Sequence, residues 1–260
     1  MTVKIAVAGG LGRMGSAVIR AAKARDGLDV VAAYDKPAWY DHDAEGVRLI
    51  PFEEALTAAD VVIDFTAPEA TFALAHAAYE RGAPALVIGS TGLNADQEAE
   101  VAHAAQRVPI VRAGNFSLGV AILQGLVEQA AKRLDESEWD AEVFEAHHRR
   151  KVDAPSGTAL MLGEAVARGR GVELRERRVG TREGVTAPRE EGAIGFSVLR
   201  GGGIVGEHSV TFATDDEILT LSHSARDRSL FARGALAAAR WVVGKPPGLY
   251  DMQDVLGFRG

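Results

Sequence analysis

The stretch Val3-Lys4-Ile5-Ala6-Val7-Ala8-Gly9-Gly10-Leu11-Gly12-Arg13-Met14-Gly15 decides how this chain begins to fold. An apolar run of strand length is followed by a glycine cluster and then by apolar residues at helical spacing. The glycines fit G-x-G-x-x-G from Gly10 or G-x-x-G-x-x-G from Gly9. Either spacing lets the backbone turn tightly and approach a pyrophosphate at a helix N-terminus. The alternative is a tight turn that binds no ligand.

The same alternation of strand and helix continues to about residue 115. Five apolar runs of strand length occur at Val3–Ala8, Asp29–Tyr34, Val61–Asp64, Ala85–Ile88 and Ile110–Arg112. Helical spacing lies between them at Arg13–Arg25, Pro68–Arg81 and Ala95–Arg107. Strands that alternate with helices predict an α/β fold, here a Rossmann-type, doubly wound parallel sheet covered on both faces.

The pattern changes after Asn115. A long helix is expected over Ser117–Arg133, and period-two alternation in Ser209–Thr214 and Ile218–Ser224 predicts strands of an antiparallel or mixed sheet. A closing helix is expected over Arg228–Val243, with Asp227 as its cap. We therefore expect a dinucleotide-binding domain of residues 1–115 and 227–260 and a second α+β domain of residues 116–226. The segment from Arg168 to Gly192 is interpreted as a mobile loop or lid.

Candidate cofactor contacts follow from the ends of the predicted parallel strands, where ligands of open sheets bind. The glycine turn contributes Gly9, Gly10, Leu11, Gly12, Arg13 and Met14. Two later strand ends, suited to a nicotinamide carboxamide, contribute Gly89, Ser90, Thr91, Ala113, Gly114, Asn115 and Phe116. Asp64-Phe65-Thr66 ends another strand, and Phe65 is expected to pack near the cofactor.

Asp35 and Lys36 bear on which dinucleotide binds. Asp35 lies about 20 residues past the glycine turn, where an acid binds the ribose hydroxyls. Lys36 either neutralises a 2′-phosphate or is a solvated surface lysine. We therefore expect NADH and NADPH both to bind, with the preference open.

The segment Glu145-Ala146-His147-His148-Arg149-Arg150-Lys151-Val152-Asp153-Ala154-Pro155-Ser156-Gly157-Thr158 holds five consecutive basic or imidazole residues in a chain of net charge −7. Ser156 and Thr158 are N-cap candidates for a helix over Thr158–Arg168. A carboxylate at that helix start would meet N–H groups, hydroxyls and cations together. A solvated basic patch is the alternative. No metal site is expected, because adjacent strand residues face opposite ways and no partner has ligand spacing.

This segment resembles the signature of the 4-hydroxy-tetrahydrodipicolinate reductases, formerly called dihydrodipicolinate reductases, which runs E-x-H-H-x-x-K-x-D-x-P-S-G-T. Five further stretches resemble the family in the same order: Gly9–Gly15, Asp64-Phe65-Thr66, Asn115-Phe116-Ser117-Leu118-Gly119-Val120, Ile204-Val205-Gly206-Glu207-His208 and Gly248-Leu249-Tyr250-Asp251-Met252. Departures are mild. Ser90 stands where the family often has Thr, Gly203 where an acid is frequent, and Arg150 in a position that varies.

The resemblance implies an NAD(P)H-dependent reductase that converts (2S,4S)-4-hydroxy-2,3,4,5-tetrahydrodipicolinate to tetrahydrodipicolinate in lysine and diaminopimelate biosynthesis. It implies His147 as a catalytic acid/base, Lys151 as a proton donor, and His148, Gly157 and Thr158 as substrate contacts. A small cyclic imine with two carboxylates is then the substrate. The family is usually tetrameric, which implies a homotetramer formed through the second domain.

Composition limits the other classes of function. The net charge of −7 disfavours nucleic acid and anionic membranes as partners, and without cysteine no disulfide or thiolate site can form. No apolar run of about 18 residues occurs, so a cytoplasmic protein is expected by default. Two alternatives remain: another two-domain NAD(P)-dependent amino-acid dehydrogenase, and a non-enzymatic NAD(H)-sensing module.

Overall fold

The computed structural model describes residues 2–40, 42–227 and 229–259. The chain divides into two compact units, Met1–Leu118 with Ser229–Gly260, and Gly119–Arg228. The second unit is therefore inserted between two segments that together build the first.

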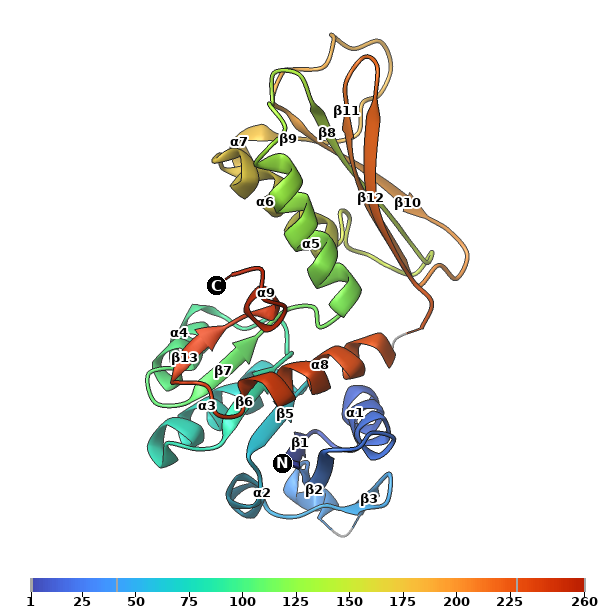
Figure 1. The fold of residues 1–260 in the computed structure, drawn as a ribbon. Helices are drawn as coiled ribbons and strands as arrows, with labels where there is room; N and C mark the ends of the chain where they lie inside the picture. The colour runs from blue at the N-terminus through green and yellow to red at the C-terminus, as the bar shows by residue number, and fades with distance from the viewer. Residues whose placement is uncertain (1, 41, 228, 260) are drawn as a thin grey trace. The chain divides into compact units, whose positions relative to one another are not determined.

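The first unit is built around a six-stranded parallel sheet (Figure 1). Its elements are β1 (Val3–Ala8), α1 (Arg13–Lys23), β2 (Leu28–Tyr34), η1 (Pro37–Trp39), β3 (Asp43–Ala44), β4 (Val47–Arg48), α2 (Phe52–Ala58), β5 (Val61–Asp64), α3 (Pro68–Arg81), β6 (Ala85–Ile88), α4 (Ala95–Ala104), β7 (Pro109–Arg112), α8 (Ser229–Val242), β13 (Gly248–Tyr250) and α9 (Met252–Val255). The strand order is β13-β7-β6-β5-β1-β2, and β3 pairs with β4 in a separate small hairpin.

Helices cover both faces of this sheet, with α1 and α8 packed together on one face and α3 and α4 on the other (Figure 1). Every residue of β5 and β6 is accordingly buried, as expected for parallel strands between two helical layers. Helix α8 comes so close to the preceding chain that a Cβ added at Gly234 would lie 1.6 Å from the carbonyl oxygen of Phe116. Glycine at this position is therefore required for the helix to pack.

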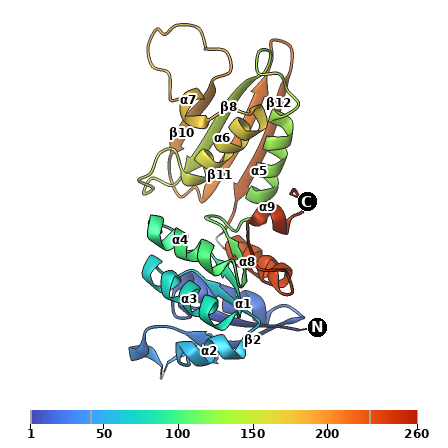
Figure 2. The same ribbon diagram turned by 90° about the vertical axis from the view of Figure 1, so that its left-hand side faces the viewer.

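The second unit holds a five-stranded mixed sheet (Figure 2). Its elements are α5 (Leu118–Ala131), β8 (Asp140–His147), α6 (Gly157–Arg170), α7 (Leu174–Arg177), β9 (Arg178–Val179), β10 (Ile194–Arg200), β11 (Gly206–Ala213) and β12 (Ile218–Ala225). The strand order is β12-β11-β8-β10-β9; β8 runs parallel to β10 and antiparallel to β11. These two sheets confirm the predicted fold class.

Helices α5 and α6 cover one face of this second sheet, and its other face carries exposed apolar side chains. Residues alternate along β8 accordingly: Ala141 and Val143 are buried under the helices, whereas Glu142 and Phe144 are exposed. Phe144, Leu199 and Ile218 are 37%, 43% and 71% exposed. On strands whose core-facing residues pack under α5 and α6, these three positions point away from the helices.

The predicted segment boundaries agree with the structure to within a few residues, with two exceptions. The mobile loop expected from Arg168 to Gly192 is wrong over its first part, because α6 continues to Arg170 and α7 and β9 follow. Gly171 ends α6 in the left-handed conformation, and Leu174 is buried, so this part of the segment packs onto the unit. The expected start of the last helix at Arg228 lies outside the described residues.

Candidate active site

Four polar side chains gather on the helix-covered face of the second sheet, at the end where β8 and β10 finish. Glu145 and His147 are two residues apart on β8 and so point to the same face. Arg200 on β10 pairs with His147 on β8, and His208 on β11 pairs with Glu145 on β8. Strand register therefore brings Arg200 to Glu145, 55 positions away in the sequence.

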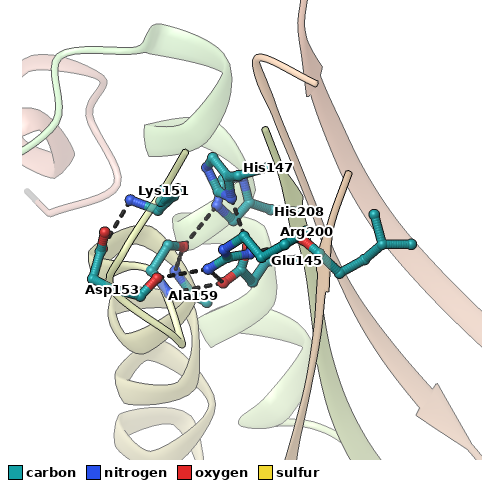
Figure 3. A network of polar contacts seen from close by, with 9 residues as sticks. Glu145, His147, Lys151, Asp153, Ala159, Arg200 and His208 are labelled. Carbon is teal, nitrogen blue, oxygen red and sulfur yellow. Dashed lines mark hydrogen bonds and ion pairs between the residues drawn. The ribbon is translucent and has the colours of Figure 1, made fainter. Parts of the chain in front are cut away.

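Glu145 lies at the centre of this group and is fully buried (Figure 3). Its Oε2 is 2.5 Å from Nδ1 of His147. Arg200 donates to both carboxylate oxygens at 2.7 Å. The backbone N–H of Ser156 donates to Oε1 at 2.9 Å. Burial alone would raise the pKa of Glu145, but hydrogen bonds from Arg200, His147 and Ser156 outweigh it, so the pKa is lowered and the carboxylate stays ionised.

Two residues of β11, Gly206 and His208, also border the His147 ring. A Cβ added at Gly206 would lie 3.1 Å from Nε2 of His147, so a side chain there would press on the ring. The ring of His208 meets it edge to face, with 5.0 Å between centroids. Burial, and then the nearby His147, lower the pKa of His208 to about 4, which keeps that ring neutral near pH 7.

Lys151 lies in the loop after β8 and is held by a neighbour (Figure 3). Its Nζ is 2.8 Å from Oδ2 of Asp153, and its backbone N–H donates to the carbonyl of His148. Arg200 also reaches this loop, where its Nη2 donates to the carbonyl oxygen of Asp153 at 2.6 Å. The loop that carries Lys151 is thereby joined to the strand that carries His147.

Helix α6 begins beside this loop. Ser156 is its N-cap, with the side-chain oxygen accepting from the N–H of Ala159 at 3.2 Å. The same oxygen lies 3.1 Å from Nε2 of His208. Gly157 and Thr158 form the first turn, with Gly157 exposed and Thr158 half-buried. The second unit therefore brings His147, Lys151 and the start of α6 into one neighbourhood.

The glycine turn of the first unit is tight and packs closely at the start of α1. Gly9 has a φ of 66°, and a Cβ at Gly15 would lie 2.1 Å from the Gly9 carbonyl oxygen. Gly12 occupies the N-cap of α1, where no side chain caps the helix. Uncapped N–H groups at Arg13 and Met14 fit an anionic group at this end of the helix.

Asp35 follows β2 and lies next to this turn. One carboxylate oxygen accepts from the N–H of Leu11 at 3.2 Å, and the other accepts from the N–H of Lys36 at 2.9 Å. Lys36 itself is exposed. The first unit thus brings the predicted ribose-binding acid to the predicted phosphate-binding loop.

The loops after β6 and β7 contribute less than their composition suggests. The Ser90 hydroxyl is buried against Thr71 and Asp64, at 2.5 and 3.3 Å, so it faces the protein. Phe116 is 1% exposed and packs against Phe65 with 5.5 Å between centroids. At these two positions the side chains are engaged within the protein, so a ligand contact there would have to come from the backbone. Thr91 and Gly114 are exposed, while Gly89, Ala113 and Asn115 are half-buried.

Several residues of the site were missed by sequence reasoning. Arg200 and His208 lie on strands that pair with β8, and only the register shows that they meet it. Glu145 could have been found, since residues i and i+2 of a strand share a face. Within residues 2–40, 42–227 and 229–259, no group of three or more His, Cys, Asp or Glu side chains is arranged to hold a metal. No helix in these ranges has the length and apolarity needed to cross a membrane.

Comparisons with known proteins show which family this chain resembles. Residues 3–116 match the family "Dihydrodipicolinate reductase, N-terminus", and residues 119–256 match "Dihydrodipicolinate reductase, C-terminus". A 4-hydroxy-tetrahydrodipicolinate reductase of Caulobacter vibrioides is 61% identical over 99% of this chain and 98% of its own, and one of Rhizobium rhizogenes is 50% identical over 98% and 97%. The fold resembles dipicolinate-bound dihydrodipicolinate reductase from Paenisporosarcina sp. TG-14, with a TM-score of 0.80, 22% identity, and coverage of 98% and 99%.

The two family matches together span residues 3–116 and 119–256, and the identity with one relative is 61% over nearly the whole length. The chain belongs to the dihydrodipicolinate reductase family.

Proposed function

We propose that His147 and Lys151 handle the proton in the reaction of this family, while a bound nicotinamide supplies the hydride. The reaction is the NAD(P)H-dependent reduction of (2S,4S)-4-hydroxy-2,3,4,5-tetrahydrodipicolinate to tetrahydrodipicolinate, a step of lysine and diaminopimelate biosynthesis. Adding hydride to a ring conjugated with C=N also requires a proton, so a positioned donor is needed near the reacting ring.

The observation that carries this proposal is the convergence of His147, Lys151 and the first turn of α6. His147 ends β8 with Nδ1 engaged by Glu145, and Lys151 is a cation of the following loop that pairs with Asp153. Gly157 and Thr158 offer the backbone N–H groups of a helix start that carries no acidic residue. Such an arrangement suits a carboxylate of the substrate, with His148 as a further contact.

The first unit supports the proposal for the cofactor. Gly9, Gly10, Leu11, Gly12, Arg13 and Met14 form the turn and helix start that would hold a pyrophosphate. Asp35 would bind the adenosine ribose, and Lys36 would meet a 2′-phosphate if one is present. The chains around residues 89–91 and 113–116 would meet the nicotinamide through backbone groups. We infer that NADH and NADPH both serve.

A homotetramer built through the second unit is also proposed. The support is the sheet face opposite α5 and α6, where Phe144, Leu199 and Ile218 are exposed. Light scattering after size exclusion should give four times the mass of one chain, and Phe144→Glu should give smaller species. A parent protein that is monomeric would contradict this part. A cytoplasmic location stays a prediction.

The experiment that tests the function uses freshly generated substrate with NADH and NADPH in separate assays. Oxidation of either cofactor should require the cyclic substrate, and aspartate semialdehyde should not replace it. His147→Gln should lower kcat by roughly 10²–10⁴-fold, which is the usual contribution of a positioned acid or base. Cofactor bound without any substrate-dependent turnover would instead support a sensing module.

A further inference from the structure

Glu145 is a buried charge whose position calls for an explanation. A carboxylate removed from water is costly unless it is paired and hydrogen-bonded, and a fully buried one is uncommon. Glu145 is 0% exposed and accepts from His147, from Arg200 twice and from the Ser156 N–H. An apolar residue would pack at this place without such a requirement, so the charge itself is expected to have a role.

The contact with His147 determines which ring nitrogen carries the proton. An ionised carboxylate only accepts hydrogen bonds, so a neutral His147 ring that bonds to it must have its proton on Nδ1. Its Nε2 then presents a lone pair when the ring is neutral and an N–H when the ring is protonated. A Cβ at position 206 would lie 3.1 Å from Nε2, so Gly206 keeps a side chain of β11 from crowding this nitrogen.

Arg200 holds the carboxylate of Glu145, which is in turn hydrogen-bonded to the ring of His147. Its two Nη atoms take one oxygen each in a bidentate pair, which sets the plane of the carboxylate. The Nη2 atom also donates to the carbonyl of Asp153, whose side chain pairs with Lys151. A single guanidinium thus joins the strand of His147 to the loop of Lys151.

We propose that Glu145, held by Arg200, is a positioning residue that keeps His147 in the Nδ1–H tautomer and so presents Nε2 to the substrate. This inference rests on the function proposed above for His147. Neither Glu145 nor Arg200 touches the reacting atoms in this scheme. Their effect is transmitted through the orientation and the tautomer of one imidazole, as an orienting carboxylate does for the histidine of a Ser-His-Asp triad.

The decisive variant is Glu145→Gln, which keeps the shape of the side chain and removes its charge. The matched control is Glu142→Gln, the same change on the same strand at an exposed acid that is paired with Arg189. We expect Glu145→Gln to lower kcat by about 10-fold or more, up to the roughly 10²–10⁴-fold expected for loss of His147 itself. KM and the cofactor Kd should stay within about twofold, and the control should match the parent.

A spectroscopic readout separates positioning from mere structural support. In protein with ¹³C- and ¹⁵N-labelled histidine, at a pH where the ring is neutral, His147 should show the Nδ1–H tautomer, assigned by its loss in His147→Gln. In Glu145→Gln the ring should become a mixture of tautomers. If the single change prevents folding, the charge-free pair Glu145→Gln with Arg200→Gln takes its place, and the same loss of kcat and of tautomer is expected.

Two results would overturn the inference: a folded Glu145→Gln or double variant with parental kcat, or a parent ring protonated on Nε2. The second measurement needs no turnover and decides the matter even if neither variant folds. Failure of the proposed function looks different. In that case the parent lacks substrate-dependent NAD(P)H oxidation, or His147→Gln is silent, while the tautomer of His147 stays as described.

Discussion

The ammonium Nζ of Lys151 lies 2.8 Å from Oδ2 of Asp153, two residues further along the same loop. The hydrogen bond from Lys151 is the largest reason why the pKa of Asp153 is lowered. Because the Asp153 side chain is 52% exposed, the pair is worth no more than about 1 kcal/mol. The pair therefore restrains Lys151 in the loop only weakly.

Lys151→Ala should lower kcat by roughly 10²–10⁴-fold at saturating substrate, because it removes the proton donor proposed above. Cofactor affinity should change little, since the dinucleotide is assigned to the other unit. Steady-state kinetics and a cofactor titration check both. Arg150→Ala is the matched control, an exposed cation one position away, and it should behave as the parent. If the whole cluster were a solvated patch, both variants would be nearly silent.

His148→Gln and Thr158→Ala should raise KM more than they lower kcat. These residues are assigned to binding the substrate carboxylates in the ground state as well as in the transition state, and uniform binding of this kind appears in KM. Initial rates across a range of substrate concentrations separate the two constants. A fall in kcat with KM unchanged would assign these side chains to the chemical step instead.

Lys36→Ala should weaken NADPH more than NADH. An exposed lysine that contacts a phosphate is worth roughly 1 kcal/mol, or several-fold in Kd. Fluorescence titration with each cofactor measures the two constants. Lys4→Ala serves as the control, because Lys4 is also an exposed lysine of the first unit and lies on β1. Equal weakening of the two cofactors would show that Lys36 does not contact the 2′-phosphate.

The free energy of unfolding should fall as the pH is lowered from about 6.5 toward 4. Unfolded His208 takes up a proton near its ordinary pKa of 6.5, whereas in the folded protein burial and His147 hold the pKa at about 4. In this window the unfolded state binds more protons, so stability declines with acidity by up to about 1.4 kcal/mol per pH unit. Glu145, whose pKa is lowered on folding, adds stability above its unfolded pKa that is lost at still lower pH.

Urea unfolding at several pH values tests this dependence. His208→Asn removes the titrating group, so its stability should depend less on pH between 6.5 and 4. His42→Asn, at an exposed position, should keep the parental slope. Replacing Trp39 and Trp241 by Phe leaves Trp139 as the sole tryptophan, in the same unit as His208. Identical slopes for the His208 variant and the parent would remove His208 as the cause.

The sequence was sufficient for the elements of the first unit because their signals are local. A buried strand, a glycine turn and an amphipathic helix each show their own periodicity, as Val3–Ala8 and Arg13–Lys23 illustrate. Strand β13 has only three residues, too few for any period to appear, and was not predicted as an edge of the sheet. The inward turn of the Ser90 hydroxyl depends on Thr71, a residue of helix α3, and could not be inferred from the loop itself.

The part of the candidate site that is contiguous in the sequence could be predicted for the same reason. The run from His147 to Lys151 and the helix start at Ser156 stand together in the sequence, so their neighbourhood could be expected. Arg200 meets Glu145 only through the parallel pairing of β8 with β10, and a one-residue slip of that register would turn it to the other face. Long-range register of this kind leaves no local pattern.

Helix α8 covers the first unit but is synthesised after the whole of the second. Its residues Ala232, Ala235 and Leu236 are fully buried, and it packs on β5, β6 and α1. Ribosomes add about 5–20 residues per second, so on the order of ten seconds separates the emergence of β7 from that of α8. During translation all core residues of the inserted unit are therefore synthesised before α8. The amino-terminal strands of the first unit are synthesised well before the helix that covers them. The unit that begins first along the chain is therefore the last to have all of its core residues synthesised.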